Sequence, residues 1–230
     1  ARGRGGGEII VWRGRVGCPN VLRLPGAGGA SLLQSFGIPL VADMPGVGAD
    51  LQDHYQARFN YRCSERITIN DMMGSLHTRM AAGLNYILFR KGFLTIGAGY
   101  AGGFFKTDAS LPSPDVQIHF ILFSADTVGQ KLHPFPGFLA SVCQLRPESR
   151  GHVRIKSADP LAAPAIAPRY LSSPVDREVM TRGMQLTRKI MGQPALARYI
   201  AEELVPGKQC AGDADLLQFA RDKGTTVFHP

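Results

Sequence analysis

The side chain best suited to take part in a chemical reaction is a histidine at the end of the chain. Residues 224–230 read Gly-Thr-Thr-Val-Phe-His-Pro, a β-forming run that leads directly into His229. Histidine exchanges protons near neutral pH because its unperturbed pKa is about 6.5. Taken alone, His229 is more simply interpreted as a surface histidine. Because an isolated strand lacks partners and the sequence starts at Ala1 without Met, we expect the chain to be a fragment.

Two further histidines lie in segments that could approach a ligand. His54 ends the run 45–54, in which Gly46 and Gly48 allow a tight turn or a close backbone approach. His119 alternates with apolar neighbours, so it either lines a cavity or is a hydrogen-bonded core residue. The remaining histidines are not grouped and the four cysteines form no CxxC pair, so the sequence predicts no metal site.

Hydrophobic periodicity predicts the elements that must position these side chains. Strands are expected at 8–12, 38–42, 56–62, 116–123, 138–145 and 152–156. Helices are expected to begin at Pro19, to cover 80–89, and to cover 176–191 and 213–222, the last N-capped by Asp213. A run of strands with helices laid to one side predicts an α+β fold built on an antiparallel sheet.

The overall composition excludes several classes of protein. The 230 residues are 44% hydrophobic, enough to bury a core, and no run approaches the roughly 18–20 apolar residues of a membrane span. Scattered cysteines favour reduced thiols in a cytoplasmic setting. The net charge of +8 includes an Arg/Gly run at 1–7 and a basic strip of Arg146, Arg150, Arg154 and Lys156. Without interleaved aromatics, this strip indicates a solvated or anion-binding edge, and nucleic-acid binding is the least favoured function.

Several motifs, in a fixed order, resemble those of one enzyme family. They are Gly-Cys-Pro-Asn-Val-Leu-Arg-Leu-Pro-Gly-Ala-Gly at 17–28, Pro-Gly-Val-Gly-Ala-Asp-Leu-Gln-Asp-His at 45–54, Arg-Pro-Glu-Ser-Arg-Gly-His-Val at 146–153, Ser-Ala-Asp-Pro at 157–160, Gln-Pro-Ala-Leu at 193–196 and Phe-His-Pro at 228–230. Together they are similar to the glucose–methanol–choline (GMC) flavoprotein oxidoreductases, especially the bacterial choline and alcohol dehydrogenases.

The resemblance implies an FAD enzyme that oxidises a primary alcohol to an aldehyde by hydride transfer to the flavin. It divides the chain into 1–58, part of a Rossmann-like α/β FAD-binding domain, and 59–230, a substrate-binding domain whose final strand returns to the flavin. We expect a cytoplasmic protein, with peripheral association with the inner membrane as the alternative, and the resemblance specifies no electron acceptor. The implied site has His229 as the catalytic base, Tyr100 and His119 against the substrate, and the cofactor contacts Gly14, Gly46, Gly48, Asp50, Leu51, His54 and Pro230.

Departures from the family pattern keep two alternatives open. The Gly-x-Gly-x-x-Gly fingerprint is absent and bulky cations occupy 12–16, so we expect the chain alone to bind FAD poorly and to catalyse little. Tyr100 stands where choline-oxidising relatives carry a glutamate, which favours a neutral alcohol over choline. The alternatives are therefore a choline dehydrogenase and a non-catalytic remnant that acts as a binding or assembly module.

Overall fold

The computed structural model describes residues 10–97, 99–126 and 129–229, which form two compact units. Unit 1 contains Ala1–Gln52 and Ser149–Ser172, and unit 2 contains Asp53–Glu148 and Ser173–Pro230. The chain therefore leaves unit 1 and returns to it, whereas the sequence analysis placed a single boundary after residue 58. Residues 149–172 belong with unit 1 because Leu51 and Gly151 exchange two backbone hydrogen bonds, of 2.9 and 2.8 Å.

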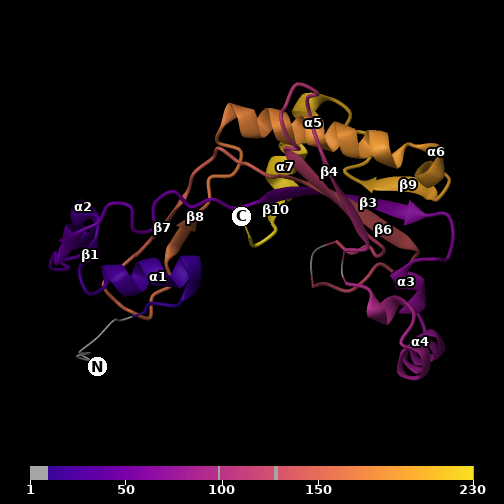
Figure 1. The fold of residues 1–230 in the computed structure, drawn as a ribbon, viewed down its shortest axis with the longest axis horizontal. Helices are drawn as coiled ribbons and strands as arrows, with labels where there is room; N and C mark the ends of the chain where they lie inside the picture. Colours follow the sequence, from indigo (N-terminus) through magenta and orange to yellow (C-terminus); the bar gives the residue numbers. More distant parts are fainter. Residues whose placement is uncertain (1–9, 98, 127–128, 230) are drawn as a thin grey trace. The chain divides into compact units, whose positions relative to one another are not determined.

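Unit 1 is small and contains short elements (Figure 1). A core of Leu33, Ile38 and Ile155 holds them together. Its helices are α1 (Gly14–Arg23) and α2 (Ala30–Ser35), and its strands are the parallel pair β1 (Ala27–Gly28) and β2 (Ala42–Asp43) and the antiparallel pair β7 (His152–Arg154) and β8 (Ala165–Ala167). The predicted strand at 152–156 is confirmed in its first three residues.

Three predictions for unit 1 are wrong. Ile10–Trp12 form no strand, and the rest of the strand predicted at 8–12 lies outside the described residues. Only Ala42 of the predicted strand 38–42 is in a strand, and Ile38 packs into the core from the segment before it. Helix α1 begins at Gly14 and contains Pro19 in its interior. The helix was predicted to begin at Pro19 because proline is well tolerated in a first helical turn, and this prediction placed the start too late.

Unit 2 is built on an antiparallel sheet, as predicted. In the described residues the strand order is β10-β3-β6-β5-β4, and β9 pairs with β3 as well. The strands are β3 (Tyr55–Cys63), β4 (Ala101–Phe105), β5 (Val116–Ile121), β6 (Gly137–Gln144), β9 (Ile200–Val205) and β10 (Thr225–Thr226). Strands were expected at four of these places, and β4 and β9 are the additions.

Helices flank the sheet (Figure 1). They are α3 (Ile69–Met72), α4 (Leu76–Phe89), the 3₁₀ turn η1 (Phe93–Thr95), α5 (Pro174–Met191), α6 (Pro194–Ala197) and α7 (Asp213–Lys223). Helix α5 confirms its prediction and is capped by Ser173, whose side chain accepts a hydrogen bond from the amide of Val175. Helix α7 is also confirmed, but Gly212 is its N-cap and Asp213 its first residue.

Side chains alternate between the two faces of the central strands. On the face that packs against α5, Phe59, Tyr61 and Phe138 stack with ring centroids 5.4–6.4 Å apart. Gly183 brings α5 close to this face, since a Cβ there would lie 3.0 Å from a methyl carbon of Val142. We call the opposite face, which carries Arg58 and the residues aligned with it, the cavity face. Because the side-chain period is two, the core packing fixes which residues point there.

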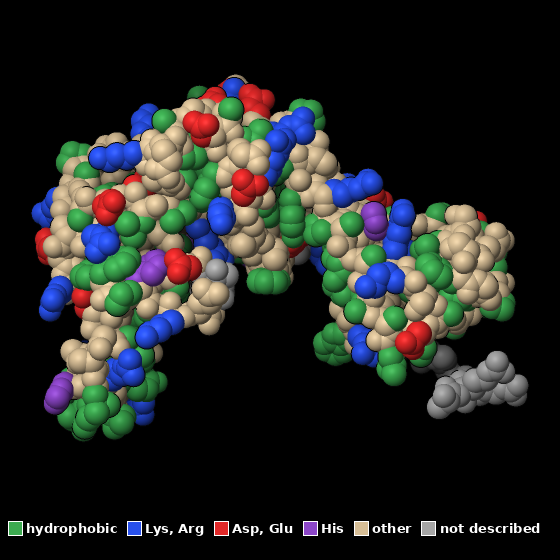
Figure 2. Space-filling model, turned by 180° about the vertical axis from the view of Figure 1, so that it is seen from behind, with side chains coloured by type: hydrophobic (Ala, Val, Ile, Leu, Met, Phe, Trp, Pro, Cys, Tyr) green, Lys and Arg blue, Asp and Glu red, His purple; other side chains and the backbone are tan. Residues whose placement is uncertain are grey.

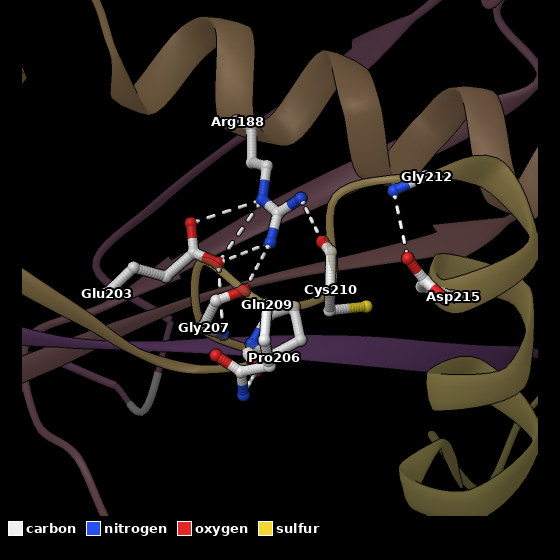
Figure 3. Close-up of polar contacts among 8 residues, drawn as sticks. All are labelled: Arg188, Glu203, Pro206, Gly207, Gln209, Cys210, Gly212 and Asp215. Atoms are coloured by element: carbon white, nitrogen blue, oxygen red, sulfur yellow. Dashed lines mark hydrogen bonds and ion pairs between the residues drawn. The ribbon is translucent and has the colours of Figure 1, made fainter.

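Arg188 of α5 fastens the segment between β9 and α7 (Figure 3). Its guanidinium donates to both carboxylate oxygens of Glu203, the shortest bond being 2.6 Å, and to the carbonyl oxygens of Cys210 and Gly207 at 2.6 and 3.1 Å. Burial lowers the pKa of Arg188, but the hydrogen bonds and charge of Glu203 outweigh it and raise that pKa overall. This segment leads through α7 into β10, and His229 follows β10 in the chain.

Acidic and basic side chains are interspersed on the face of unit 2 that Figure 2 shows, without a single-sign field that would suit a polyanion. Helix α4 was predicted from apolar side chains at helical spacing, yet it has no buried residue, and Leu76, Met80, Leu84 and Ile87 are each more than half exposed. Among the described helices, none is long and apolar enough to cross a membrane.

Candidate active site

The pairing of β3 with β10 brings together two of the predicted site histidines. The amide of His54 donates to the carbonyl oxygen of His229, and the amide of Val227 donates to the carbonyl oxygen of His54, both at 3.0 Å. The two rings meet edge to face with centroids 5.2 Å apart. Thr226 supports this turn, since its hydroxyl donates to the Asp53 carboxylate and accepts from the amide of Phe228. Pro230, the other predicted residue here, lies outside the described residues.

His54 is buried, and its hydrogen bond defines its tautomer. Its Nε2 lies 3.0 Å from the carbonyl oxygen of Leu145, which can only accept, so Nε2 carries the hydrogen. In the neutral ring Nδ1 is then an acceptor, and this buried atom has no hydrogen-bond partner among the described residues. The hydrogen bond at Nε2 thus fixes the ring of His54 and leaves Nδ1 as an available hydrogen-bond acceptor.

His119 lies on the cavity face of the sheet and lines a cavity of about 320 Å³. Its register places it beside Ser141, which in turn lies beside Arg58, so these three residues form one row across β5, β6 and β3. Burial, followed by the charges of His229 and His54, lowers the pKa of His119. At neutral pH its ring is therefore uncharged, and its buried Nδ1 has no described hydrogen-bond partner.

Tyr100 is not brought together with the histidines. It lines a second cavity of about 320 Å³ with Ile118, Phe120 and Ala140, which point toward α5. Because Ile118 and His119 are consecutive in one strand, the two cavities lie on opposite faces of the sheet. The role of Tyr100 in substrate binding stays a prediction.

The other predicted cofactor contacts lie in unit 1. Gly14 is the first residue of α1, and Gly46, Gly48, Asp50 and Leu51 form the loop that precedes β3. Gly48 has a φ of +69° and lies so close to the carbonyl oxygen of Val153 that no side chain would fit. The amide of Val153 donates to the carbonyl oxygen of Gly48 at 2.8 Å, which fixes the loop against β7.

A basic cavity of about 310 Å³ lies beside this loop in unit 1. Arg23, His152 and Arg154 line it together with Gly48, and no acidic side chain is among the described residues of its lining. The guanidinium of Arg23 donates to the carbonyl oxygens of Val47 and Val153, and burial, then the charge of Arg154, lowers its pKa. The sequence signalled Arg154 as part of an anion-binding edge but gave no sign of Arg23.

Arg58 is the other site residue that the sequence analysis missed. It lines the histidine cavity, and alternation within the predicted strand 56–62 already placed it on the face opposite Phe59. No group of three or more histidine, cysteine, aspartate or glutamate side chains in the described residues could hold a metal ion.

Comparisons with known proteins agree with this architecture. A sequence profile described as GMC oxidoreductase matches residues 147–230. The alcohol dehydrogenase [acceptor] of Pseudomonas putida is 35% identical over 97% of this chain and 41% of its own length. The oxygen-dependent choline dehydrogenase of Pseudomonas aeruginosa is 36% identical over 97% of this chain and 40% of its own. The chain thus spans about 40% of the length of these relatives.

Solved structures share the fold. Formate oxidase from Aspergillus oryzae superposes with a TM-score of 0.84 over 94% of this chain and 42% of its own, at 22% identity. Pyridoxine 4-oxidase from Mesorbium loti gives a TM-score of 0.75 over 94% of this chain and 38% of its own, at 21% identity. With the ordered motifs, the sheet topology and the relatives in agreement, residues 147–230 match the GMC oxidoreductase family, and the chain is similar to proteins of this kind over 97% of its length.

Proposed function

We propose that the protein is an FAD-dependent oxidoreductase that oxidises a primary alcohol to an aldehyde. The observation that carries the proposal is the grouping of His229, His54 and His119 beside one cavity of unit 2. The match of residues 147–230 to an oxidoreductase family supports it, and FAD is named for the formate oxidase that shares the fold.

The histidines have complementary tasks. FAD, when bound, accepts the hydride that leaves the carbinol carbon. His229 takes the hydroxyl proton as this carbon–hydrogen bond breaks, so that the alcohol becomes a carbonyl without building up charge. His54 supports the ring of His229 at 5.2 Å, and the uncharged His119 offers a hydrogen bond to the substrate oxygen.

The residues of unit 1 fit the cofactor's chemistry. FAD carries an anionic diphosphate, and the basic cavity lined by Arg23, His152 and Arg154 is suited to an anionic group. The adjoining loop with Gly46 and Gly48 exposes backbone atoms without side-chain hindrance, since nothing lies within 4 Å of a Cβ built at Gly46. We assign these residues, together with Gly14, Asp50, Leu51 and Pro230, to cofactor binding.

Choline oxidation is the second candidate, because choline dehydrogenases are among the similar proteins. The cavity that His119 lines contains no acidic side chain among its described residues and contains the cationic Arg58. A quaternary ammonium group would therefore meet repulsion rather than a counter-charge. An uncharged or anionic alcohol suits this cavity better than choline.

The test is anaerobic reduction of bound flavin by primary alcohols, followed through the flavin absorbance, in protein expressed from the complete gene. His229→Ala is expected to slow the reduction about 10²–10⁴-fold, the contribution typical of a general base. His77→Ala is the matched control because His77 is exposed on α4. Equal rates for His229→Ala and the parent protein would refute the role of His229, and a flavin that no alcohol reduces would refute the proposed activity.

A further inference from the structure

Arg58 is a cation in an otherwise uncharged part of the cavity that His119 lines. It lies in the middle of β3, with Ser141 and His119 beside it in one cross-strand row. The other described side chains that line the cavity carry no charge. They include the polar Gln56 and the apolar Ile121, Phe123, Leu139, Val227 and Phe228. A guanidinium that is half-buried among such groups loses hydration, which costs free energy unless an anion compensates.

The part of the chain that the structure describes provides no such anion for Arg58. Other arginines of unit 2 have acidic partners: Arg62 lies 3.6 Å from Glu202, and Arg188 binds Glu203 at 2.6 Å. The guanidinium of Arg58 has no hydrogen bond, ion pair or ring contact to a described residue. Burial alone lowers its pKa, without an opposing carboxylate. Arg58 is thus a cationic group of the cavity that has no counter-charge among the described residues, and an anionic ligand could provide one.

We propose that Arg58 binds a carboxylate on the alcohol, so that the substrates are hydroxycarboxylic acids. This inference rests on the proposed alcohol oxidation and names its substrate class. Arginine suits the task because its planar fork donates two parallel hydrogen bonds to a carboxylate. The neighbouring Gln56 and Ser141 add polar groups at the same place in the lining. This substrate class differs from the neutral alcohol that Tyr100 suggested.

The sheet geometry sets the length of the substrate. Arg58 and His119 are separated by one strand, which places their Cα atoms about 10 Å apart, and His54 lies at most about 13 Å from Arg58 along the chain. A hydroxyl among the histidines and a carboxylate at Arg58 therefore fit a substrate whose two groups are several carbons apart. Apolar lining residues such as Leu139 and Phe123 suit the intervening methylene groups. An ω-hydroxy acid satisfies this spacing, and glycolate does not.

The experiment compares ω-hydroxyhexanoate with n-hexanol, which lacks the carboxylate, in the flavin-loaded protein expressed from the complete gene. Arg58→Met is expected to lower kcat/KM for ω-hydroxyhexanoate roughly 10- to 150-fold, as hydrogen bonds to a charged group imply, and to leave n-hexanol oxidation nearly unchanged. Arg58→Lys keeps the charge without the fork and should retain part of the preference. Arg62→Met is the matched control, because Arg62 lies on the same strand outside the cavity lining.

Each outcome decides between the proposals. An equal loss for both substrates in Arg58→Met would show a structural role, and no loss for either would exclude Arg58 from binding; both results overturn the inference while alcohol oxidation stands. If the parent protein oxidises neither alcohol, calorimetric titration with hexanoate and hexanamide still tests Arg58. Binding of hexanoate that Arg58→Met abolishes would support the carboxylate site without the activity. Equal binding of hexanoate and hexanamide would overturn it.

Discussion

Replacing Arg188 by methionine is expected to destabilise unit 2 far more than replacing any exposed arginine of the same helix. Methionine keeps the apolar stem of the side chain but removes every donor. The carboxylate of Glu203 then loses its counter-charge, and the carbonyl oxygens of Cys210 and Gly207 lose a donor. The backbone amide of Gly207 remains the carboxylate's described partner, at 3.2 Å.

The magnitude follows from burial. The side chains of Arg188 and Glu203 are only 24% and 16% exposed, so the pair lies near the buried limit, where removing one partner costs about 3–5 kcal/mol. Allowing for the remaining exposure, we expect a loss of about 2–4 kcal/mol in the free energy of unfolding. Arg182 on the same helix pairs with Glu178 at 2.7 Å and is 44% exposed, so Arg182→Met should cost less than about 1 kcal/mol.

Urea unfolding followed by far-ultraviolet circular dichroism measures both variants. Tryptophan fluorescence is unsuitable because Trp12, the single tryptophan, belongs to unit 1. Equal midpoints for Arg188→Met and Arg182→Met would refute the reasoning, since the network would then contribute no more than a surface ion pair. Glu203→Gln should fall between the two, because the amide oxygen can still accept from Arg188.

Two further perturbations address packing and protonation. Gly183→Val should destabilise unit 2 by about 1–3 kcal/mol in urea unfolding, because even the first added carbon would lie 3.0 Å from a Val142 methyl and 3.3 Å from one of Val116. His119 should titrate by NMR below the ordinary histidine pKa of about 6.5, since burial lowers its pKa in the fold. His119 therefore contributes stability that is complete above its unfolded pKa of about 6.5 and is lost as the pH falls toward the folded value. Titration of His119 at or above a pH of about 6.5 would contradict this.

The sequence predicted the elements of unit 2 well because their periodicity reflects real burial. The strand predicted at 56–62 directs its apolar side chains Ala57, Phe59 and Tyr61 to one buried face, and the helix at 176–191 buries helically spaced side chains such as Met180, Met184 and Met191. β4 escaped notice because its Ala-Gly-Gly-Phe-Phe sequence has weak β propensity and is held by pairing with β5. The signal for β4 therefore lies in its partner strand β5 and not in its own residues.

Unit 1 was harder to predict because its elements are short and part of its core comes from a distant segment of the chain. Its elements are two to ten residues long, and they are held by β7 and β8, which follow more than one hundred residues later in the chain. Arg23 illustrates the limit: its partners include the carbonyl oxygen of Val153, 130 positions away. The resemblance of the motifs identified the loop that contains Gly46 and Gly48. The basic cavity beside this loop could be found only in the folded structure, because segments distant in the sequence line it.

The placement of Arg58 follows from the core and not from its own preferences. Phe59 and Tyr61 stack beneath α5, so their register along β3 is fixed by buried aromatic packing. A slip of one residue would turn Phe59 toward the cavity and Arg58 into the core, at the cost of a buried charge and of the ring contacts. Arg58 is therefore held on the cavity face by neighbours that never touch the substrate. In the proposed enzyme, substitution of Arg58 is accordingly expected to alter which alcohol binds without disturbing the packing that positions this residue.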